Sequence, residues 1–576
     1  MIKTLMSQVK QYKKDSILCP IFVILEVIME VIIPFLMASI IDKGVEAGNM
    51  MHVIKIGTIM IIMAMMSLTF GALAGKYAAS ASTGFAKNLR KTMFQNIQSF
   101  SFSNIDKYST AGLVTRLTTD ITNVQNAYQM VVRLCTRAPI MLICAMFMAF
   151  KINSRLSMVF LGAALFLGVS LYLITKNVHP LFMKVFKKYD ALNASVQENI
   201  NAVRVVKAYV REEYEINKFH TACENIYKLF VNAEKILVLN MPIMQFAVYT
   251  CILLVSWIGA KMIVGGSLTT GELMSLFTYI MNIMISLMMI SMIFVMVIMS
   301  KASAERIVEV INEKSDLNNK ENPVYEVKDG SIAFENVNFS YKKDGEKVLS
   351  NINLNIESGQ TIGVIGGTGS AKSSLVQLIP RLYDTESGQV KVGGLNVKEY
   401  DIETLRNEVA MVLQKNTLFS GTIKENLMWG NENATDAEIE AAASSACVDE
   451  FIDRLPGRYD MDLGQGGVNV SGGQKQRLCI ARAILKKPKV LILDDSTSAV
   501  DTATDSKIRK AFKEDLKNTT KIIIAQRINS VSDADKIIVM DDGRISAIGT
   551  HDELMNTSEI YKDVYNSQQE GVGFGE

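Results

Sequence analysis

Six long apolar runs occupy the first half of the chain and constrain its fold more than any other feature. They lie near residues 17–41, 53–74, 140–150 with flanks, 156–174, 236–264 and 274–299. A helix needs about 20 apolar residues to cross a bilayer, and most of the runs reach that length. The sequence therefore predicts an α-helical polytopic membrane domain with six transmembrane helices, surrounded by a lipid bilayer.

The links between these runs alternate in length and charge. Those after the first, third and fifth runs are short, whereas those after the second and fourth are long, polar and basic. The long links keep a helical periodicity, which predicts helices that project from the membrane. Because basic loops stay in the cytoplasm, we expect both long links and both termini on the cytoplasmic side of a cell (inner or plasma) membrane. Lys151 and Arg155 lie on the opposite side, where long side chains can reach the interface.

Glu26 and Glu30 lie one helical turn apart in the first run and so share a face. A carboxylate inside a membrane is a candidate functional group. One interpretation is attraction of cationic substrates, or an internal proton or salt-bridge role. The other is that both face protein or a watery cavity, with a partner such as Lys76.

A glycine-rich stretch stands out in the second half: Gly366-Gly367-Thr368-Gly369-Ser370-Ala371-Lys372-Ser373-Ser374. An apolar run precedes it and a segment of helical character follows, which is typical of a strand, a phosphate-binding loop and a helix start. Backbone N–H groups of such a loop can cradle phosphate oxygens, the lysine reaches the outer phosphates, and a following hydroxyl can bind Mg²⁺. Ala371 stands where this pattern expects glycine, and its methyl group adds strain if the position needs a positive φ.

Composition excludes several other classes. The chain is 49% apolar with a formal net charge of +2, so it lacks the basic field of a dedicated nucleic-acid binder. Seven scattered cysteines without a C-x-x-C pair argue against disulfides and zinc. Residues 1–310 are interpreted as the transmembrane domain and 311–330 as a charged linker. Alternating strands and helices in 331–576 predict an α/β domain that binds nucleotide.

The segment Val470-Ser471-Gly472-Gly473-Gln474-Lys475-Gln476-Arg477 resembles the signature motif of ATP-binding cassette (ABC) transporters. Residues 366–374 are similar to the Walker A loop of that family, 490–494 to its Walker B strand and 498–501 to its D-loop. Six spans followed by one cassette resemble an exporter-type half-transporter over essentially the whole chain. The resemblance implies an α/β P-loop ATPase domain after the membrane domain, with ATP as ligand and Mg²⁺ as cofactor.

The resemblance also implies roles for single residues. Tyr341 would stack on adenine, Ser373 and Asp494 would hold the metal, and Gln414 would touch the metal or the attacking water. The signature residues would face ATP held by the other subunit, because cassettes of this family close head to tail. The ATP-binding residues implied in this way are Tyr341, Gly366, Thr368, Gly369, Ser370, Ala371, Lys372, Ser373, Ser374, Gln414, Asp494, Ser471, Gly472, Gly473 and Gln474.

Two catalytic positions depart from the family pattern. Asp495 stands where the family has a glutamate as general base, and Gln526 stands where it has a switch histidine. Aspartate is one methylene shorter, and general-base catalysis depends on reach. Glutamine can hydrogen-bond a γ-phosphate but takes up no charge near neutral pH.

These departures, beside an intact signature, favour one subunit of a heterodimeric exporter that moves amphipathic molecules outward, in the manner of multidrug transporters. Its own site would hydrolyse ATP weakly, and its signature would complete a competent site on a different half-transporter. The alternatives are a slow homodimeric exporter of lipid or peptide, and a non-transporting regulator or channel gated by ATP. The sequence does not name the substrate.

Overall fold

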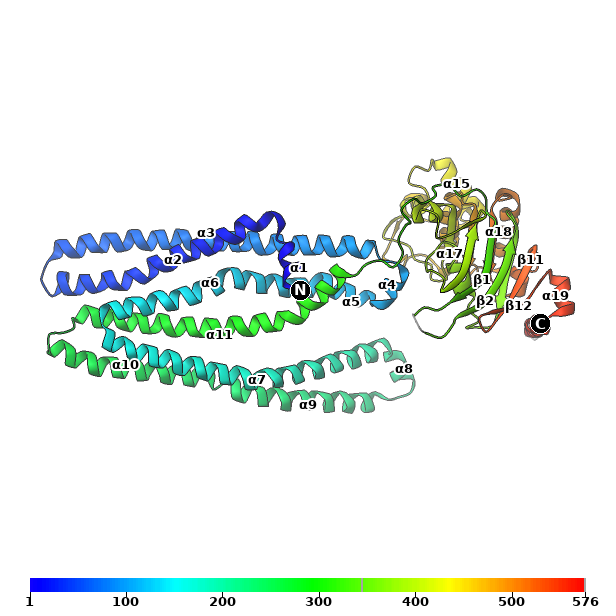
Figure 1. Cartoon of the computed structure of the whole chain (residues 1–576). Helices are drawn as coiled ribbons and strands as arrows, with labels where there is room; N and C mark the ends of the chain where they lie inside the picture. Colours follow the sequence, from blue (N-terminus) through cyan, green and yellow to red (C-terminus); the bar gives the residue numbers. More distant parts are fainter. Residues whose placement is uncertain (343–344, 574–576) are drawn as a thin grey trace. The chain divides into compact units, whose positions relative to one another are not determined.

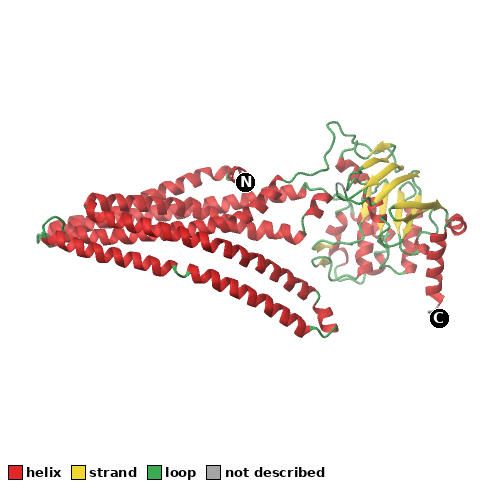
Figure 2. Ribbon diagram, turned by 60° about the horizontal axis from the view of Figure 1, so that its bottom comes forward, coloured by secondary structure: helices red, strands yellow, loops and turns green. Residues whose placement is uncertain are grey.

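The computed structural model describes residues 1–342 and 345–573, which divide into two compact units (Figure 1). Met1–Gln98 and Thr110–Glu313 form the helical unit. Ser99–Ser109 and Lys314–Glu576 form the α/β unit. Figure 2 shows that the strands belong to the second of these units.

Among the described residues, six helical stretches are long and apolar enough to cross a membrane, as the apolar runs predict. They cover Lys10–Val45, Met50–Gln98, Thr110–Ile152, Ser154–Asn201, Glu212–Val264 and Thr270–Asn312. The helices within them are α2 (Lys13–Ile40), α3 (Met50–Gln98), α5 (Thr110–Thr115), α6 (Ile121–Ile152), α7 (Ser154–Asn201), α9 (Glu212–Leu237), α10 (Asn240–Val264) and α11 (Thr270–Asn312). The short helices α1 (Ile2–Ser7) and α8 (Val203–Ala208) complete this unit.

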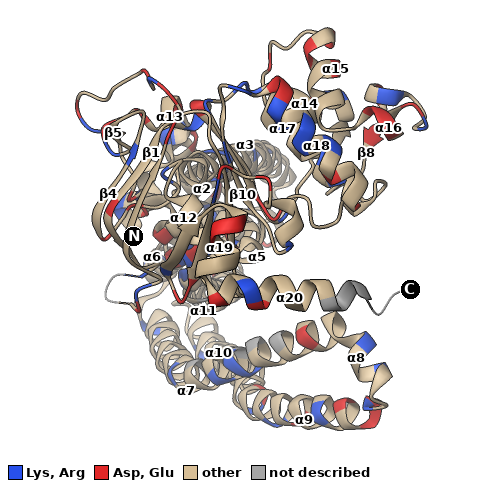
Figure 3. Cartoon of the chain, turned by 90° about the vertical axis from the view of Figure 1, so that its right-hand side faces the viewer, with Lys and Arg blue, Asp and Glu red and all other residues tan. Residues whose placement is uncertain are grey.

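The long basic links are largely helical, as predicted, and the helices of the spans extend into them. Helix α3 runs on to Gln98 and α7 to Asn201, and α9 returns along α7 (Figure 1). Figure 3 shows lysine and arginine on α8 and α9, in the second long link. Lys151, on the opposite side, places its Nζ atom 5.5 Å from the centre of the Phe35 ring. A cation over an aromatic face is stabilised in such a partly apolar setting.

Small and β-branched residues bring α2 and α3 into the core of the helical unit. Val23, Val27 and Val31 recur every four residues on α2 and are buried. Ala74 and Ala78 of α3 belong to the same core, and small side chains allow helix backbones to approach closely. The phenol of buried Tyr279 on α11 donates a hydrogen bond to the Val31 carbonyl oxygen at 2.8 Å. Helices α2, α3 and α11 are thereby joined into one bundle.

The α/β unit is built on two sheets. One has the strand order β12-β11-β3-β10-β9-β6, in which all neighbours are parallel except β11 and β12. Its strands are β3 (Thr361–Gly366), β6 (Val409–Val412), β9 (Val490–Asp494), β10 (Thr520–Ile524), β11 (Lys536–Asp541) and β12 (Arg544–Gly549). Strands β9 and β10 are buried at every position, as expected for parallel strands covered on both faces.

The second sheet is antiparallel, with the order β2-β1-β4-β5. Its strands are β1 (Ile332–Phe339), β2 (Leu349–Ile356), β4 (Ser387–Val392) and β5 (Leu395–Asn396). A two-stranded pair joins β7 (Gly421–Thr422) to β8 (Asp462–Leu463). The helices of the unit are α4 (Phe102–Lys107), α12 (Lys372–Gln377), α13 (Ile402–Glu408), α14 (Ile423–Met428), α15 (Asp436–Ser445), α16 (Asp449–Ile452), α17 (Gly472–Leu485), α18 (Thr502–Asp515), α19 (His551–Thr557) and α20 (Glu559–Gly573).

Helix α4 belongs to the α/β unit although it follows the long helix α3 in the chain. The phenol of Tyr383 donates a hydrogen bond to an Asp106 carboxylate oxygen at 2.6 Å. The Phe102 ring meets the Tyr383 ring edge-on, with 6.0 Å between centroids. Ser103 donates to Asp316 at 2.6 Å, and Ser101 donates to the same carboxylate. The link after the second span is therefore fastened to the α/β unit by both polar and aromatic contacts.

Candidate functional site

The order of the parallel strands brings four separate sequence segments to one edge of the sheet. Strands β3, β10, β9 and β6 are neighbours, and each is followed by a segment singled out from the sequence. The glycine-rich loop follows β3, Gln526 follows β10, Asp494 ends β9, and Gln414 follows β6. The carboxyl ends of parallel strands are the usual place for a ligand site in such sheets.

The glycine-rich loop is shaped by close backbone contacts. A Cβ atom on Gly366 would lie 2.2 Å from the Met540 carbonyl oxygen, so no other residue fits there. Gly369 has a φ of +86° and Ala371 a φ of +68°. Ala371 therefore has the left-handed backbone conformation that the pattern expects of a glycine. Its methyl group makes this conformation strained. Thr368, which lies between the two glycines, and Ser370 complete the loop ahead of α12.

Lys372 keeps its ammonium group at this loop. Its Nζ atom donates to the carbonyl oxygens of Gly366 at 2.9 Å and Gly367 at 2.7 Å, and to Ser370 Oγ at 3.2 Å. Burial lowers the pKa of Lys372, while the nearby carboxylates of Asp494 and Asp495 act in the opposite direction. The loop thus combines a cation with backbone donors, as a phosphate site requires.

Ser373 and Asp494 form a pair of hard oxygen ligands. Ser373 Oγ donates to Asp494 Oδ1 at 2.9 Å, and the Asp494 side chain is almost wholly buried. Burial raises the pKa of Asp494, the Ser373 hydrogen bond lowers it, and the neighbouring charge of Asp495 raises it further. A buried carboxylate beside a hydroxyl suits Mg²⁺, which prefers oxygen ligands, so the residues present fit this metal.

The two residues that depart from the family pattern touch each other. The Gln526 side-chain amide donates to Asp495 Oδ2 at 2.7 Å. Burial raises the pKa of Asp495, and hydrogen bonds from Gln526 and Gln414 lower it. The Asp495 backbone has a φ of +50°, an unusual conformation for a residue with a side chain. The carboxylate is therefore held by two neutral amides.

Tyr341 lies beside the loop, as the resemblance implies. Its hydroxyl is 2.8 Å from Ser374 Oγ, and its ring is perpendicular to that of Tyr383 with 5.1 Å between centroids. The side chain is partly exposed, which leaves a face free for a ring of the adenine type.

The Ser471–Gln474 segment, at the start of helix α17, is separate from the residues around the 366–374 loop. Ser471 Oγ accepts from the Gln474 backbone N–H at 3.3 Å, and Gln474 Oε1 accepts from the Ser471 backbone N–H at 2.8 Å, which is a capping box. A Cβ atom on Gly473 would lie 2.8 Å from the Ala499 carbonyl oxygen, whereas one on Gly472 has room. In the described part of the chain, no hydrogen bond joins this segment to the 366–374 loop. The structure therefore brings together every predicted site residue except these four.

Gln476 belongs to the signature segment, but the sequence alone does not reveal the contacts that it makes. Its side chain is buried, donates to Ser498 Oγ at 3.3 Å and accepts from the Ala499 N–H at 3.0 Å. It thereby joins α17 to the segment ahead of α18. The one sequence signal for these contacts is the position of a glutamine next to the apolar run of α17.

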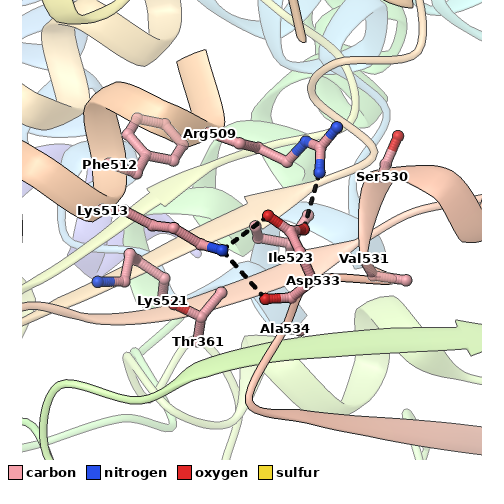
Figure 4. A pocket seen from close by; sticks show the side chains of 10 residues that line it. All are labelled: Thr361, Arg509, Phe512, Lys513, Lys521, Ile523, Ser530, Val531, Asp533 and Ala534. Carbon is pink, nitrogen blue, oxygen red and sulfur yellow. Dashed lines mark hydrogen bonds and ion pairs between the residues drawn. The ribbon is translucent and has the colours of Figure 1, made fainter. Parts of the chain in front are cut away.

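A small pocket near the amino ends of β3 and β10 is a structural brace (Figure 4). Arg509 and Lys513 of α18 approach Asp533 at 2.7 and 2.9 Å, and Ser530 Oγ donates to Asp505 at 3.1 Å. Arg509 and Lys513 are neutralised by the Asp533 carboxylate, so they offer little to an anionic ligand. The contacts tie α18 to the segment that follows Gln526.

The membrane carboxylates have a partner other than the one suggested. Arg137 of α6 donates to Glu26 Oε1 and to Glu30 Oε2, each at 2.6 Å. Lys76 was the wrong choice because contact between α2 and α6 brings the Arg137 fork between the two carboxylates. Gly71 of α3 leaves space for Glu26, since a Cβ atom there would lie 3.1 Å from Oε1. A salt bridge therefore occupies this face and removes much of the expected attraction for cations.

Comparisons with known proteins agree with this geometry. Residues 16–288 match the family model "ABC transporter transmembrane region", and residues 349–498 match the family model "ABC transporter". The uncharacterized ABC transporter ATP-binding protein YfiB of Bacillus subtilis is 37% identical, over 98% of each chain. An ATP-dependent lipid A-core flippase of Desulfotalea psychrophila is 30% identical, over 84% of each chain.

A solved structure shows the same fold. The structure of a bacterial Atm1-family ABC exporter with ATP bound superposes with a TM-score of 0.83, at 23% sequence identity. The match covers 96% of this chain and 99% of the other.

Proposed function

This chain belongs to the ABC transporter family, as a half-transporter of the exporter type, and on that premise we propose that it is the weakly hydrolysing subunit of a heterodimeric exporter. The premise gives an ATP-driven, multi-pass membrane protein with its nucleotide-binding domain on the cytoplasmic side. The proposal adds an asymmetry between two ATP sites and a second, different half-transporter as partner.

The contact between Gln526 and Asp495 carries this proposal. A general base must reach the attacking water. The side chain of aspartate places its carboxylate about one ångström closer to the backbone than the glutamate that the family uses. Here the short carboxylate is also engaged by the amide of Gln526. Because the amide takes up no proton, the pair lacks the charge that a switch histidine could supply beside the γ-phosphate.

The residues of this chain to which we assign nucleotide binding lie together around the same site. The Gly366–Ser374 loop and Lys372 would hold the phosphates, Tyr341 the adenine, and Ser373 with Asp494 the metal. Bound Mg²⁺ supplies charge neutralisation between the outer phosphates. We therefore expect ATP to bind tightly at this site and to be hydrolysed slowly.

The signature segment serves the other site in this proposal. Ser471–Gln474 heads a well-capped helix and has no hydrogen bond to the 366–374 loop among the residues that the structure describes. Its sequence is intact, so it can complete a competent site whose Walker loop, glutamate and histidine come from the partner. The substrate class we propose is amphipathic or hydrophobic small molecules, in keeping with the apolar spans.

One observation favours a second candidate, a homodimeric exporter of lipid. The Desulfotalea relative is named as an ATP-dependent lipid A-core flippase, and the similarity extends over most of both chains. In that case Asp495 and Gln526 would suffice for slow turnover.

ATP turnover separates the two candidates. The chain would be purified in lipid nanodiscs, alone and together with the half-transporter encoded beside it. We expect negligible turnover alone and strong turnover together, abolished when the partner's catalytic glutamate is changed to glutamine. Substantial turnover of the chain alone would instead establish the homodimer.

A further inference from the structure

The last helix of the chain presents a stripe of four residues to the nucleotide-binding domain. Tyr561, Val564, Tyr565 and Gln568 of α20 follow the spacing i, i+3, i+4 and i+7, which places them on one face. Tyr561 is fully buried, and Val564 and Tyr565 pack on the same core. The Tyr561 hydroxyl lies 2.8 Å from His551 Nδ1, so this stripe is also in contact with α19. His551 is half-buried.

Gln568 is the polar member of an otherwise apolar stripe, and both ends of its amide are used. Its Nε2 atom donates to the Gln526 carbonyl oxygen at 2.7 Å. The Ile528 backbone N–H donates to its Oε1 atom at 2.9 Å. The side chain thus spans the backbone on both sides of Arg527. An apolar residue would satisfy the helical pattern, so the choice of glutamine reflects these two hydrogen bonds.

The backbone held by Gln568 carries the side chain that enters the ATP site. Gln526 donates to Asp495 Oδ2 at 2.7 Å, and the Asp495 N–H donates to the Ile524 carbonyl oxygen at 3.1 Å. The segment is fixed at its far end as well. There Asp533 pairs with Arg509 (Figure 4), and Ser530 donates to Asp505. Contacts therefore run without a break from Gln568 through Gln526 to Asp495.

We propose that Gln568 is a positioning residue that sets Gln526 for recognition of the γ-phosphate, so that the C-terminal helix controls how the site distinguishes ATP from ADP. This inference rests on the role proposed for Gln526. ADP lacks the γ-phosphate and makes no use of Gln526. Loss of the Gln568 contacts therefore weakens ATP binding and leaves ADP binding as it is.

The experiment compares single variants of the full-length chain in lipid nanodiscs. Kd is measured for ATP and for ADP, each with Mg²⁺, and hydrogen exchange is followed in the peptide that contains Ile528. We expect Gln568→Ala to weaken ATP binding about tenfold, the order of one lost charge-assisted hydrogen bond, with ADP unchanged and the Ile528 amide exchanging faster. Gln569→Ala, the same change at the exposed neighbour, leaves all three values at those of the unchanged chain.

Gln568→Glu separates the two hydrogen bonds of the amide. A carboxylate still accepts from the Ile528 N–H but cannot donate to the Gln526 carbonyl oxygen. We expect the Ile528 amide to stay protected while ATP binding weakens as it does for alanine. If Gln568 had only a structural role, Gln568→Glu would bind ATP as the unchanged chain does, because the hydrogen bond from the Ile528 N–H is kept.

Gln526→Ala distinguishes a failure of this inference from a failure of the function on which it rests. If Gln526→Ala leaves the ATP-to-ADP preference unchanged, the role of Gln526 is wrong, and Gln568 has nothing to position. If Gln526→Ala lowers the preference and Gln568→Ala does not, the positioning role alone is wrong. Equal losses of ATP and ADP affinity in Gln568→Ala would also overturn it, since they indicate general damage to the domain.

Discussion

Ala371 stores backbone strain inside the phosphate loop, because an L-residue with a side chain occupies a φ of +68°. The left-handed conformation costs such a residue about 1–2 kcal/mol, and glycine does not incur this cost. We expect Ala371→Gly to raise the free energy of unfolding by up to about 1 kcal/mol, after allowance for the greater freedom of glycine in the unfolded chain. Thermal unfolding of the full-length chain without nucleotide would measure it.

The matched control is Ala441→Gly, an exposed position within helix α15. There glycine lowers helix stability by about 1 kcal/mol. If both substitutions destabilise the chain to the same extent, Ala371 is not strained.

Asp494 illustrates a conflict between stability and function at a single carboxyl group. Burial raises its pKa above that of an ordinary aspartate, so the folded chain binds this proton more tightly than the unfolded chain does. Stability therefore rises as pH falls through the range between the two pKa values, and the ionised group is unfavourable near neutral pH. We expect Asp494→Asn to stabilise the nucleotide-free chain at pH 7.5 by about 0.5–2 kcal/mol and to abolish Mg²⁺-dependent ATP binding.

Melting temperatures of both proteins between pH 7.5 and pH 5 would test this. The advantage of the variant should shrink as pH falls, because the native carboxyl group takes up its proton. An advantage that grows on acidification would contradict the direction of the pKa shift.

The sequence identified the chemistry of single residues better than their contacts. The pattern around Ala371 indicates strain at a positive φ, and Asp495 and Gln526 are visible in the sequence as departures from the family pattern. Their mutual hydrogen bond follows only from the pairing of β9 with β10, which places the ends of two distant segments side by side. Gln568 gave no signal, because its meaning depends on where the last helix packs.

At the scale of the elements, α2 and α6 are joined by a charged contact inside the membrane. Arg137 is 22% exposed and Glu26 is 13% exposed, so removal of the cation leaves carboxylates poorly solvated. We expect Arg137→Met, which keeps the length of the side chain, to destabilise the helical unit by about 3 kcal/mol. Thermal unfolding in nanodiscs would show this as a lower melting temperature of the helical unit.

The triple variant Glu26→Gln, Glu30→Gln, Arg137→Met removes all three charges. It should recover most of the lost stability, since no uncompensated charge is left in the membrane. A triple variant as unstable as Arg137→Met alone would show that packing, and not charge, explains the loss.

Helix α4 makes a second contact that can be tested at this scale. The hydrogen bond from Tyr383 to Asp106 has a charged acceptor, and such bonds contribute about 1.5–3 kcal/mol. Helix α4 follows the long helix α3 directly, so we expect Tyr383→Phe to lower the ratio of substrate-stimulated to basal ATP turnover several-fold. Ser387→Ala, on the exposed start of β4, serves as the control. An unchanged ratio would mean that this contact does not transmit substrate binding.

The helices themselves were predictable, whereas their partners were not. Length and hydropathy define all six spans because the bilayer sets a minimum apolar length. Arg137 and Glu26 are 111 residues apart in the chain, so their pairing depends on the contact of two distant helices, which no local pattern encodes. Likewise, the polar link 99–109 gives no sign that it belongs to the α/β unit.

For the whole molecule, the proposed asymmetry assigns two motifs of the same chain to two different ATP sites. In this proposal, Asp495 belongs to a weak site of this chain, and Gly472 belongs to the signature that would serve a competent site of the partner. Gly472 can be changed without disturbing the fold, because a Cβ atom there would meet its nearest neighbour, Ala499 Cβ, only at 3.8 Å. A glutamate is also favourable in the first turn of a helix and carries a charge that repels the γ-phosphate.

In the assembled pair we therefore expect unequal effects on ATP turnover. Gly472→Glu should lower kcat at least hundredfold, because it disables the site that does most of the hydrolysis. Asp495→Ala should lower it less than about threefold, since little turnover passes through its own site. In a homodimer each substitution occurs in both sites, so the two losses would be equally severe. Turnover of the two variants, measured side by side with the same partner preparation, thus reports on the division of labour without any knowledge of the transported substrate.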